Sequence, residues 1–94
     1  MSCDRKAIVR MEEGYMRLTI EYDDPMYKAE ICKDIALLEQ KLDIYPEVLH
    51  RRDNPTKWFC SVEFSGDDYI CSRTCGEFIE TLIHDLDIEK CEND

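Results

Sequence analysis

The stretch "YMRLTIEYDDP", residues 15–25, places a strand pattern directly before a helix start. Its first eight residues are apolar at every second position: Met16, Leu18, Ile20 and Tyr22. Side chains of a β-strand alternate between two faces, so this spacing predicts a strand with one buried face. Asp23-Asp24 offers a helix N-cap, and Pro25 suits the first helical position. The stretch therefore predicts a strand followed at once by a helix.

The residues on either side extend this pattern to a hairpin and a long helix. Residues 6–11, "KAIVRM", also alternate, with Val9 and Met11 on one face. Glu12-Glu13-Gly14 separates the two runs and predicts a hairpin turn. Further along, apolar residues recur at helical spacing: Tyr27, Ile31, Ile35, Leu38 and Leu42. This spacing predicts an amphipathic helix over residues 25–43.

The second half of the sequence carries three more strand patterns. "EVLHRR" (47–52) and "KWFCSVEF" (57–64) flank the turn residues "DNPT" and predict a second hairpin. Trp58 shares the parity of the apolar positions in its strand, so we expect it to pack in the core. "YICS", residues 69–72, predicts a short third strand.

The stretch "CSRTCGEF", residues 71–78, could be read as a redox couple or as a strand-to-helix joint. Thr74, with Glu77 three residues later, matches a capping box and favours the joint. The apolar positions that follow have helical spacing: Phe78, Ile79, Leu82, Ile83 and Leu86. They predict a second amphipathic helix over residues 75–88, with Cys75 on its buried face.

Together these patterns predict an α+β domain in β-β-α-β-β-β-α order. A single antiparallel sheet would have both amphipathic helices packed on one face. The chain is long enough for one compact domain, residues 1–94, with termini that fray over about 1–5 and 89–94.

A short internal similarity accompanies this order. "IEY" and "VEF" each end a strand, at offset 42, and each is followed by a helix that ends in "LDI", at offset 44. Three-letter matches between amphipathic elements arise easily by chance, so the sequence alone favours independent elements over a duplication.

The composition indicates a folded acidic protein. The chain has 22 acidic and 12 basic residues, a net charge of −10, and a hydrophobic content of 44% that is too high for a disordered tail. We expect no membrane association, since no apolar run approaches the length of a membrane span and the first residues lack the apolar core of a signal peptide. These features predict a cytoplasmic protein, in the host cell cytosol, and weaken the interpretation of the six cysteines as a disulfide framework.

The negative charge is concentrated in the last third of the chain. Residues 63–94 contain ten acidic residues against Arg73 and Lys90, whereas residues 1–62 contain twelve acidic and ten basic residues. Such a field disfavours direct nucleic-acid binding and favours a basic partner. Carboxylates on a rigid surface can pair with the arginine and lysine side chains that normally hold phosphates. The carboxylates expected to do so are Asp67, Asp68, Glu77, Glu80, Asp85 and Asp87.

A second contact patch is expected on the sheet face that the helices leave bare. Tyr15 and Phe59 have the parity opposite to the core positions, and Arg51 and Arg52 lie in the one basic island of the chain. A bare face of this kind could also associate with itself, so the sequence allows a homodimer.

Catalysis finds little support in the sequence. It contains neither a glycine-rich phosphate loop nor a nucleophile elbow nor a metal-binding histidine pair, so we expect no enzyme activity, cofactor or metal. A thiol or zinc-binding protein built on Cys60, Cys71 and Cys75 stays open as an alternative.

In size, acidity and lack of a catalytic signature, the sequence looks like phage-encoded anti-CRISPR and anti-restriction proteins. This likeness implies a non-enzymatic inhibitor, a nucleic-acid mimic that occupies the basic nucleic-acid site of a defence nuclease or CRISPR effector. An immunity protein or antitoxin that neutralises a basic nuclease toxin would use the same electrostatics and is the alternative.

Overall fold

A computed structural model describes residues 5–54, 57–65 and 72–93, which form one five-stranded sheet and two helices. The elements follow the chain as β1 (Lys6–Glu12), β2 (Tyr15–Tyr22), α1 (Tyr27–Leu42), β3 (Glu47–Asn54), β4 (Lys57–Ser65), α2 (Ser72–Asp85) and β5 (Lys90–Asn93). The predicted α+β class and both hairpins are confirmed.

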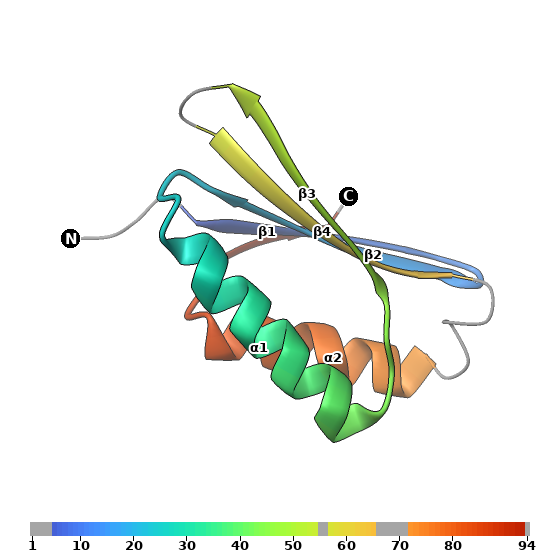
Figure 1. The fold of residues 1–94 in the computed structure, drawn as a ribbon. Coiled ribbons are helices and arrows are strands. Elements are labelled where there is room, and N and C mark those ends of the chain that lie inside the picture. Colours follow the sequence, from blue (N-terminus) through green and yellow to red (C-terminus); the bar gives the residue numbers. More distant parts are fainter. Residues whose placement is uncertain (1–4, 55–56, 66–71, 94) are drawn as a thin grey trace.

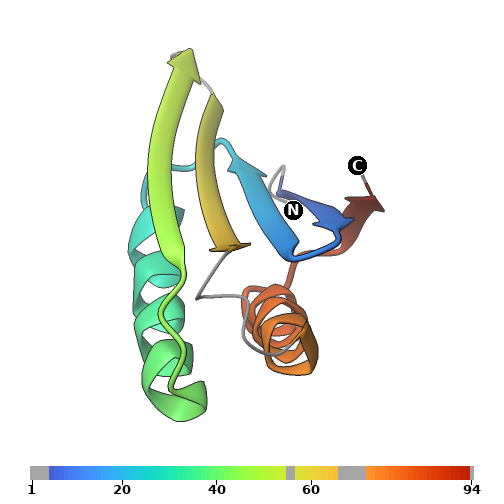
Figure 2. The ribbon, with the colours of Figure 1, turned by 90° about the vertical axis from the view of Figure 1, so that its right-hand side faces the viewer.

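The strands lie in the order β3-β4-β2-β1-β5, so the two hairpins meet at the centre of the sheet (Figures 1 and 2). Neighbouring strands are antiparallel except at one edge, where β5 runs parallel to β1, with Lys6 opposite Lys90 and Val9 opposite Asn93. The sheet is thus mixed, whereas the sequence predicted a wholly antiparallel one. The sequence predicted that the chain frays from about residue 89, but Lys90–Asn93 form this strand instead.

Arg5 is also held in place, although the sequence put it in a frayed start. Its Nη1 donates a hydrogen bond to the carbonyl oxygen of Leu86 at 3.3 Å. Its guanidinium lies 3.7 Å from the centre of the Tyr27 ring. The cation–π contact and the hydrogen bond together tie the beginning of β1 to α1 and to the residue that follows α2.

Both helices lie on the same side of the sheet (Figure 1). Two edge-to-face ring pairs join the layers: Tyr22 of β2 meets Tyr27 of α1 at 5.5 Å, and Phe64 of β4 meets Phe78 of α2 at 5.4 Å. On β2 and β4, the residues that alternate inward are fully buried in this layer: Met16, Leu18, Ile20, Tyr22, Cys60, Val62 and Phe64. Trp58 packs against the same core, as expected.

The helix starts differ from the sequence predictions. α1 begins at Tyr27, and Asp24 Oδ1 accepts a hydrogen bond from the Met26 backbone N–H at 3.0 Å, so Pro25 lies in the preceding turn. α2 begins at Ser72, which places Thr74 inside the helix and rules out its role as N-cap. Of the predicted strand 69–72, only Ser72 lies within the described residues, and it is helical.

The two "LDI" stretches have the same conformation. Asp43 and Asp87 adopt left-handed backbone angles, with φ of 53° and 56°, at the ends of α1 and α2. The next residue in each case, Ile44 or Ile88, donates its N–H to a helical carbonyl five residues back and is buried. Both helices therefore end in a Schellman motif in which aspartate takes the position that usually favours glycine.

The sheet shows the same internal symmetry. Thr19 and Ser61 face each other across the β2–β4 pair and differ by 42 residues, the offset that relates "IEY" to "VEF". An approximate twofold axis through the Thr19–Ser61 pair exchanges β2 with β4, so that each residue of β2 corresponds to the residue 42 positions later in β4. The same axis exchanges β1 with β3. The strand pairing therefore relates the two β-β-α units by an approximate twofold, a relation that the three-letter matches alone did not establish.

Candidate functional site

The outer surface of α2 carries the first part of the candidate site. One side of the helix is buried against the sheet: Cys75, Phe78, Ile79 and Leu82. Glu77 and Glu80 are exposed, and their spacing of three residues places them one turn apart on the opposite side. The amphipathic pattern that anchors α2 therefore also directs these two carboxylates into solvent.

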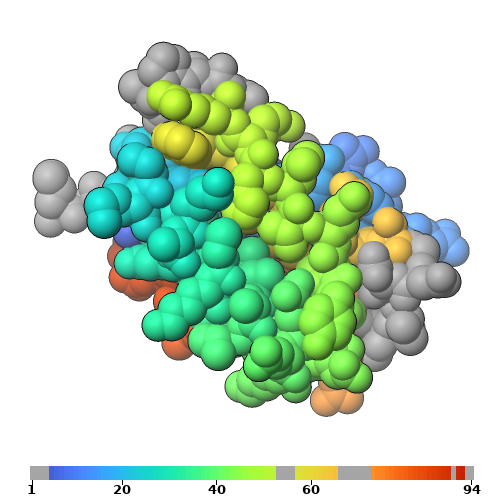
Figure 3. All heavy atoms as spheres, viewed as in Figure 1, coloured from blue at the N-terminus to red at the C-terminus, as the bar shows by residue number. Residues whose placement is uncertain are grey.

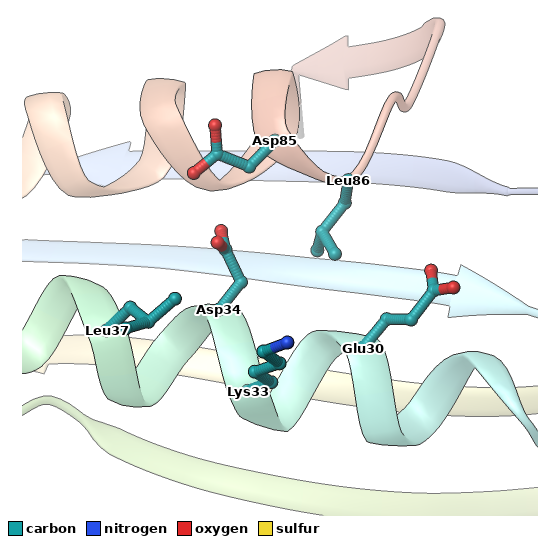
Figure 4. Close-up of a pocket in the computed structure, with 6 residues that line it drawn as sticks. All are labelled: Glu30, Lys33, Asp34, Leu37, Asp85 and Leu86. Atoms are coloured by element: carbon teal, nitrogen blue, oxygen red, sulfur yellow. The ribbon is translucent and has the colours of Figure 1, made fainter.

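A groove between α1 and α2 carries the second part (Figure 4). Its volume is about 340 Å³. It is lined by Glu30, Lys33, Asp34, Leu37, Asp85 and Leu86. Three carboxylates and one ammonium group make the groove acidic, and Figure 4 shows Asp34 and Asp85 facing each other from the two helices.

The pairing of Asp34 with Asp85 changes the acidity of the groove. Burial, and then the charge of Asp85, raise the pKa of Asp34 to about 6. Asp34 Oδ2 is shielded from solvent and accepts no hydrogen bond from the described residues, and an ionised Asp85 has no proton to donate to it. Protonated Asp34 can donate to Asp85, which also favours the neutral form. A partner's guanidinium or ammonium would stabilise both charges in place of that proton.

This carboxylate pair should cost stability at neutral pH. The pKa of Asp34 is higher in the folded chain than in the unfolded chain, so its ionisation as pH rises through about 6 opposes folding. At pH 7.5 we expect Asp34→Asn to stabilise the protein by about 1 kcal/mol, which corresponds to a rise of about 4 °C in Tm. The expected gain is this small because the groove is open to solvent, which screens the repulsion between the two carboxylates. Near pH 3.5, just below the ordinary aspartate pKa of 3.8, Asp34 is neutral in the folded chain and mostly neutral in the unfolded chain, so most of the gain should be lost.

Thermal unfolding followed by circular dichroism at the two pH values measures this difference. Glu13→Gln is the matched control, since Glu13 is exposed in the β1–β2 turn and is not among the residues that line the α1–α2 groove. An equal gain in Tm at both pH values would contradict the role of the Asp34 charge.

The structure divides the carboxylates that the sequence singled out. Glu77 and Glu80 share the outer surface of α2, Asp85 turns into the groove, and Asp87 takes the left-handed position after the helix with its side chain exposed. Asp67 and Asp68 lie outside the described residues. The sequence missed Asp34 and Glu30, because only the packing of α1 beside α2 brings them to Asp85.

The predicted second patch does not form one surface. Arg51 lies over the ring of Phe59 at 5.1 Å on the bare face, whereas Arg52 lies over Trp58 at 4.7 Å on the helix side. Tyr15 sits at the far end of β2, opposite Ser65, and donates a hydrogen bond to Glu63 at 2.7 Å. The alternation of side chains along β3 separates the two arginines, and the register separates Tyr15 from Phe59.

The cysteines of the alternative hypothesis are mostly buried. Cys60 and Cys75 are fully buried, Cys71 lies outside the described residues, and burial raises the pKa of Cys60 to about 12. On α1, the exposed Cys32 thiol lies 3.5 Å from His50 Nε2. Within residues 5–54, 57–65 and 72–93, no three His, Cys, Asp or Glu side chains are grouped to hold a metal ion.

Comparisons of the chain with protein-family models, curated proteins and solved structures gave no match. Neither helix of the described chain has the length and apolar character needed to cross a membrane. The arrangement of charged groups on the two helices therefore carries the functional inference.

Proposed function

We propose that this protein is a small acidic, non-enzymatic inhibitor that acts in the host cytoplasm. It binds the basic nucleic-acid-binding surface of a defence nuclease or CRISPR effector and needs no cofactor. It binds neither nucleic acid nor membranes itself.

The proposal is supported chiefly by one observation. α2 is packed firmly against the sheet, and its carboxylates point partly into solvent and partly into the groove. Glu77 and Glu80 face solvent, while Asp85 joins Asp34 in the groove. Because Phe78 anchors α2 against Phe64, little ordering of the helix is needed on binding. A row of fixed charges of this kind can replace nucleic-acid phosphates in a basic channel.

The raised pKa of Asp34 gives the groove a further property that suits a basic partner. An arginine side chain that enters the groove would lie between two carboxylates, each able to accept its N–H groups. Binding would then favour the ionised form of Asp34 and release a proton below pH 6.

Competition with DNA tests the proposed function. A panel of purified CRISPR effectors and restriction endonucleases is loaded with fluorescently labelled duplex DNA, and the protein is titrated in at several salt concentrations. We expect it to release the DNA from its target, with an affinity that falls as salt rises. Binding to a panel member that leaves the DNA in place, or binding of the labelled DNA by the protein itself, would contradict the proposal.

A further inference from the structure

β3 forms one edge of the sheet in the described chain and pairs with β4 on its inner side only. It is eight residues long, Glu47–Asn54, and its outer backbone edge faces away from the other strands (Figure 2). The symmetry-related strand β1 is covered on its outer edge by β5. A long open edge is a template for pairing with another strand.

The side chains of β3 on the bare sheet face are complementary to themselves. Glu47, Leu49 and Arg51 alternate along the strand and share this face, and Leu49 is 59% exposed. In an antiparallel pair of two β3 strands centred on Leu49, Leu49 meets its own copy. Glu47 of each chain then lies opposite Arg51 of the other. We propose that this protein forms a symmetric homodimer by antiparallel pairing of β3 with β3 of a second copy, in this register.

Neighbouring registers are less favourable. A pair centred on Glu47 or on Arg51 would place like charges directly opposite each other, which destabilises a sheet. A pair centred on Val48 or on His50 would set Leu49 opposite a charged residue and lose both opposite-charge pairs. A shift by one residue would bring the bare face of one copy level with the helix-covered face of the other. The register centred on Leu49 makes two opposite-charge pairs and one apolar pair.

The helix layer is compatible with this contact. α1 lies beside β3, where Cys32 Sγ approaches His50 Nε2 at 3.5 Å, and the two elements together form one face of the molecule (Figure 3). The side of α1 turned away from α2 carries the small exposed residues Ala29, Cys32 and Ala36, beside the half-buried Lys28 and Glu39. Continuation of the sheet across the twofold would bring this side toward α1 of the second copy, where small side chains permit close approach.

The dimer does not depend on the proposed function. Glu77 and Glu80 belong to α2, and the groove lies between α1 and α2, on the side of α1 away from β3. Each copy would present its own acidic surface. Loss of dimerisation and loss of target binding can therefore be measured separately.

A charge-swap experiment tests the dimer. Sedimentation equilibrium under reducing conditions is run on the native chain, on Glu47→Arg, on Arg51→Glu and on the double variant. We expect the native chain to dimerise, each single reversal to weaken the dimer roughly tenfold or more, and the double variant to restore it, since opposite charges again face each other. Arg10→Glu is the matched control, because Arg10 occupies on β1 the position that corresponds to Arg51 on β3.

Circular dichroism and Tm confirm that each variant is folded. Three results would overturn the proposal: a native chain that stays monomeric up to about millimolar concentration, a dimer that both single reversals leave intact, or folded variants in which the double reversal fails to restore the dimer.

Discussion

Replacing Glu77, Glu80 and Asp85 with lysine is expected to weaken binding to the basic target by about a thousandfold, roughly tenfold per position. Each substitution replaces a favourable contact with an arginine or lysine by a repulsive one. Glu77 and Glu80 are exposed, and Asp85 lines the groove, so the fold should tolerate the triple variant. Lysine at position 85 would also face Asp34 and remove the repulsion between two carboxylates.

The salt dependence of binding should change with the affinity. Fewer ion pairs form, so the slope of log Kd against log salt should flatten in the triple variant. The matched control reverses three exposed carboxylates outside α2 and the groove, Glu12, Glu13 and Asp23, for the same change in net charge. Equal loss of affinity in both variants, measured by interferometry at two salt concentrations, would mean that net charge rather than this site drives binding.

Phe78→Ala is expected to cost about 4 kcal/mol of unfolding free energy, much of the stability of a domain of this size. The Phe78 ring is fully buried and meets Phe64 edge to face at 5.4 Å, so its removal leaves a cavity between α2 and the sheet. Since α2 carries the candidate site, this variant should also lose target binding.

Urea unfolding followed by tryptophan fluorescence measures this cost, because Trp58 packs against the same core. Leu37→Ala removes an apolar side chain that is 56% exposed on α1 and should change the unfolding free energy by less than about 1 kcal/mol. Equal costs for the two variants would contradict the packing of α2 against β4.

Local patterns predicted most of the fold. Strict alternation in residues 15–22 fixed which side of β2 is buried, and Tyr27, Ile31, Ile35 and Leu38 form the buried side of α1 as their spacing indicated. Such patterns suffice because burial of apolar surface depends on a periodicity that is visible within a single element. Met11 shares the inward parity of Val9 but is 64% exposed, since β5 pairs with β1 only as far as Val9 and leaves Met11 at the edge of the sheet.

The remaining features depend on contacts between distant parts of the chain. β5 has four residues without an alternating apolar pattern, and it forms because β1, some 80 residues earlier, offers an open edge. The groove required Asp34 to be placed beside Asp85, which no spacing along the sequence reveals. Arg51 and Arg52 are neighbours in sequence, yet the pleat of β3 sends them to opposite faces.

The approximate twofold axis has a consequence for how the chain folds. β1–β2 and β3–β4 are hairpins with short connections, and they can form early and independently. The central β2–β4 pair joins residues 42 positions apart, such as Thr19 and Ser61, and closing that long loop costs entropy before any contact compensates for it. We therefore expect the rate-limiting step of folding to be the pairing of β2 with β4, which joins two halves that each consist of a hairpin and a helix. Neither half is expected to be stable before this pair forms.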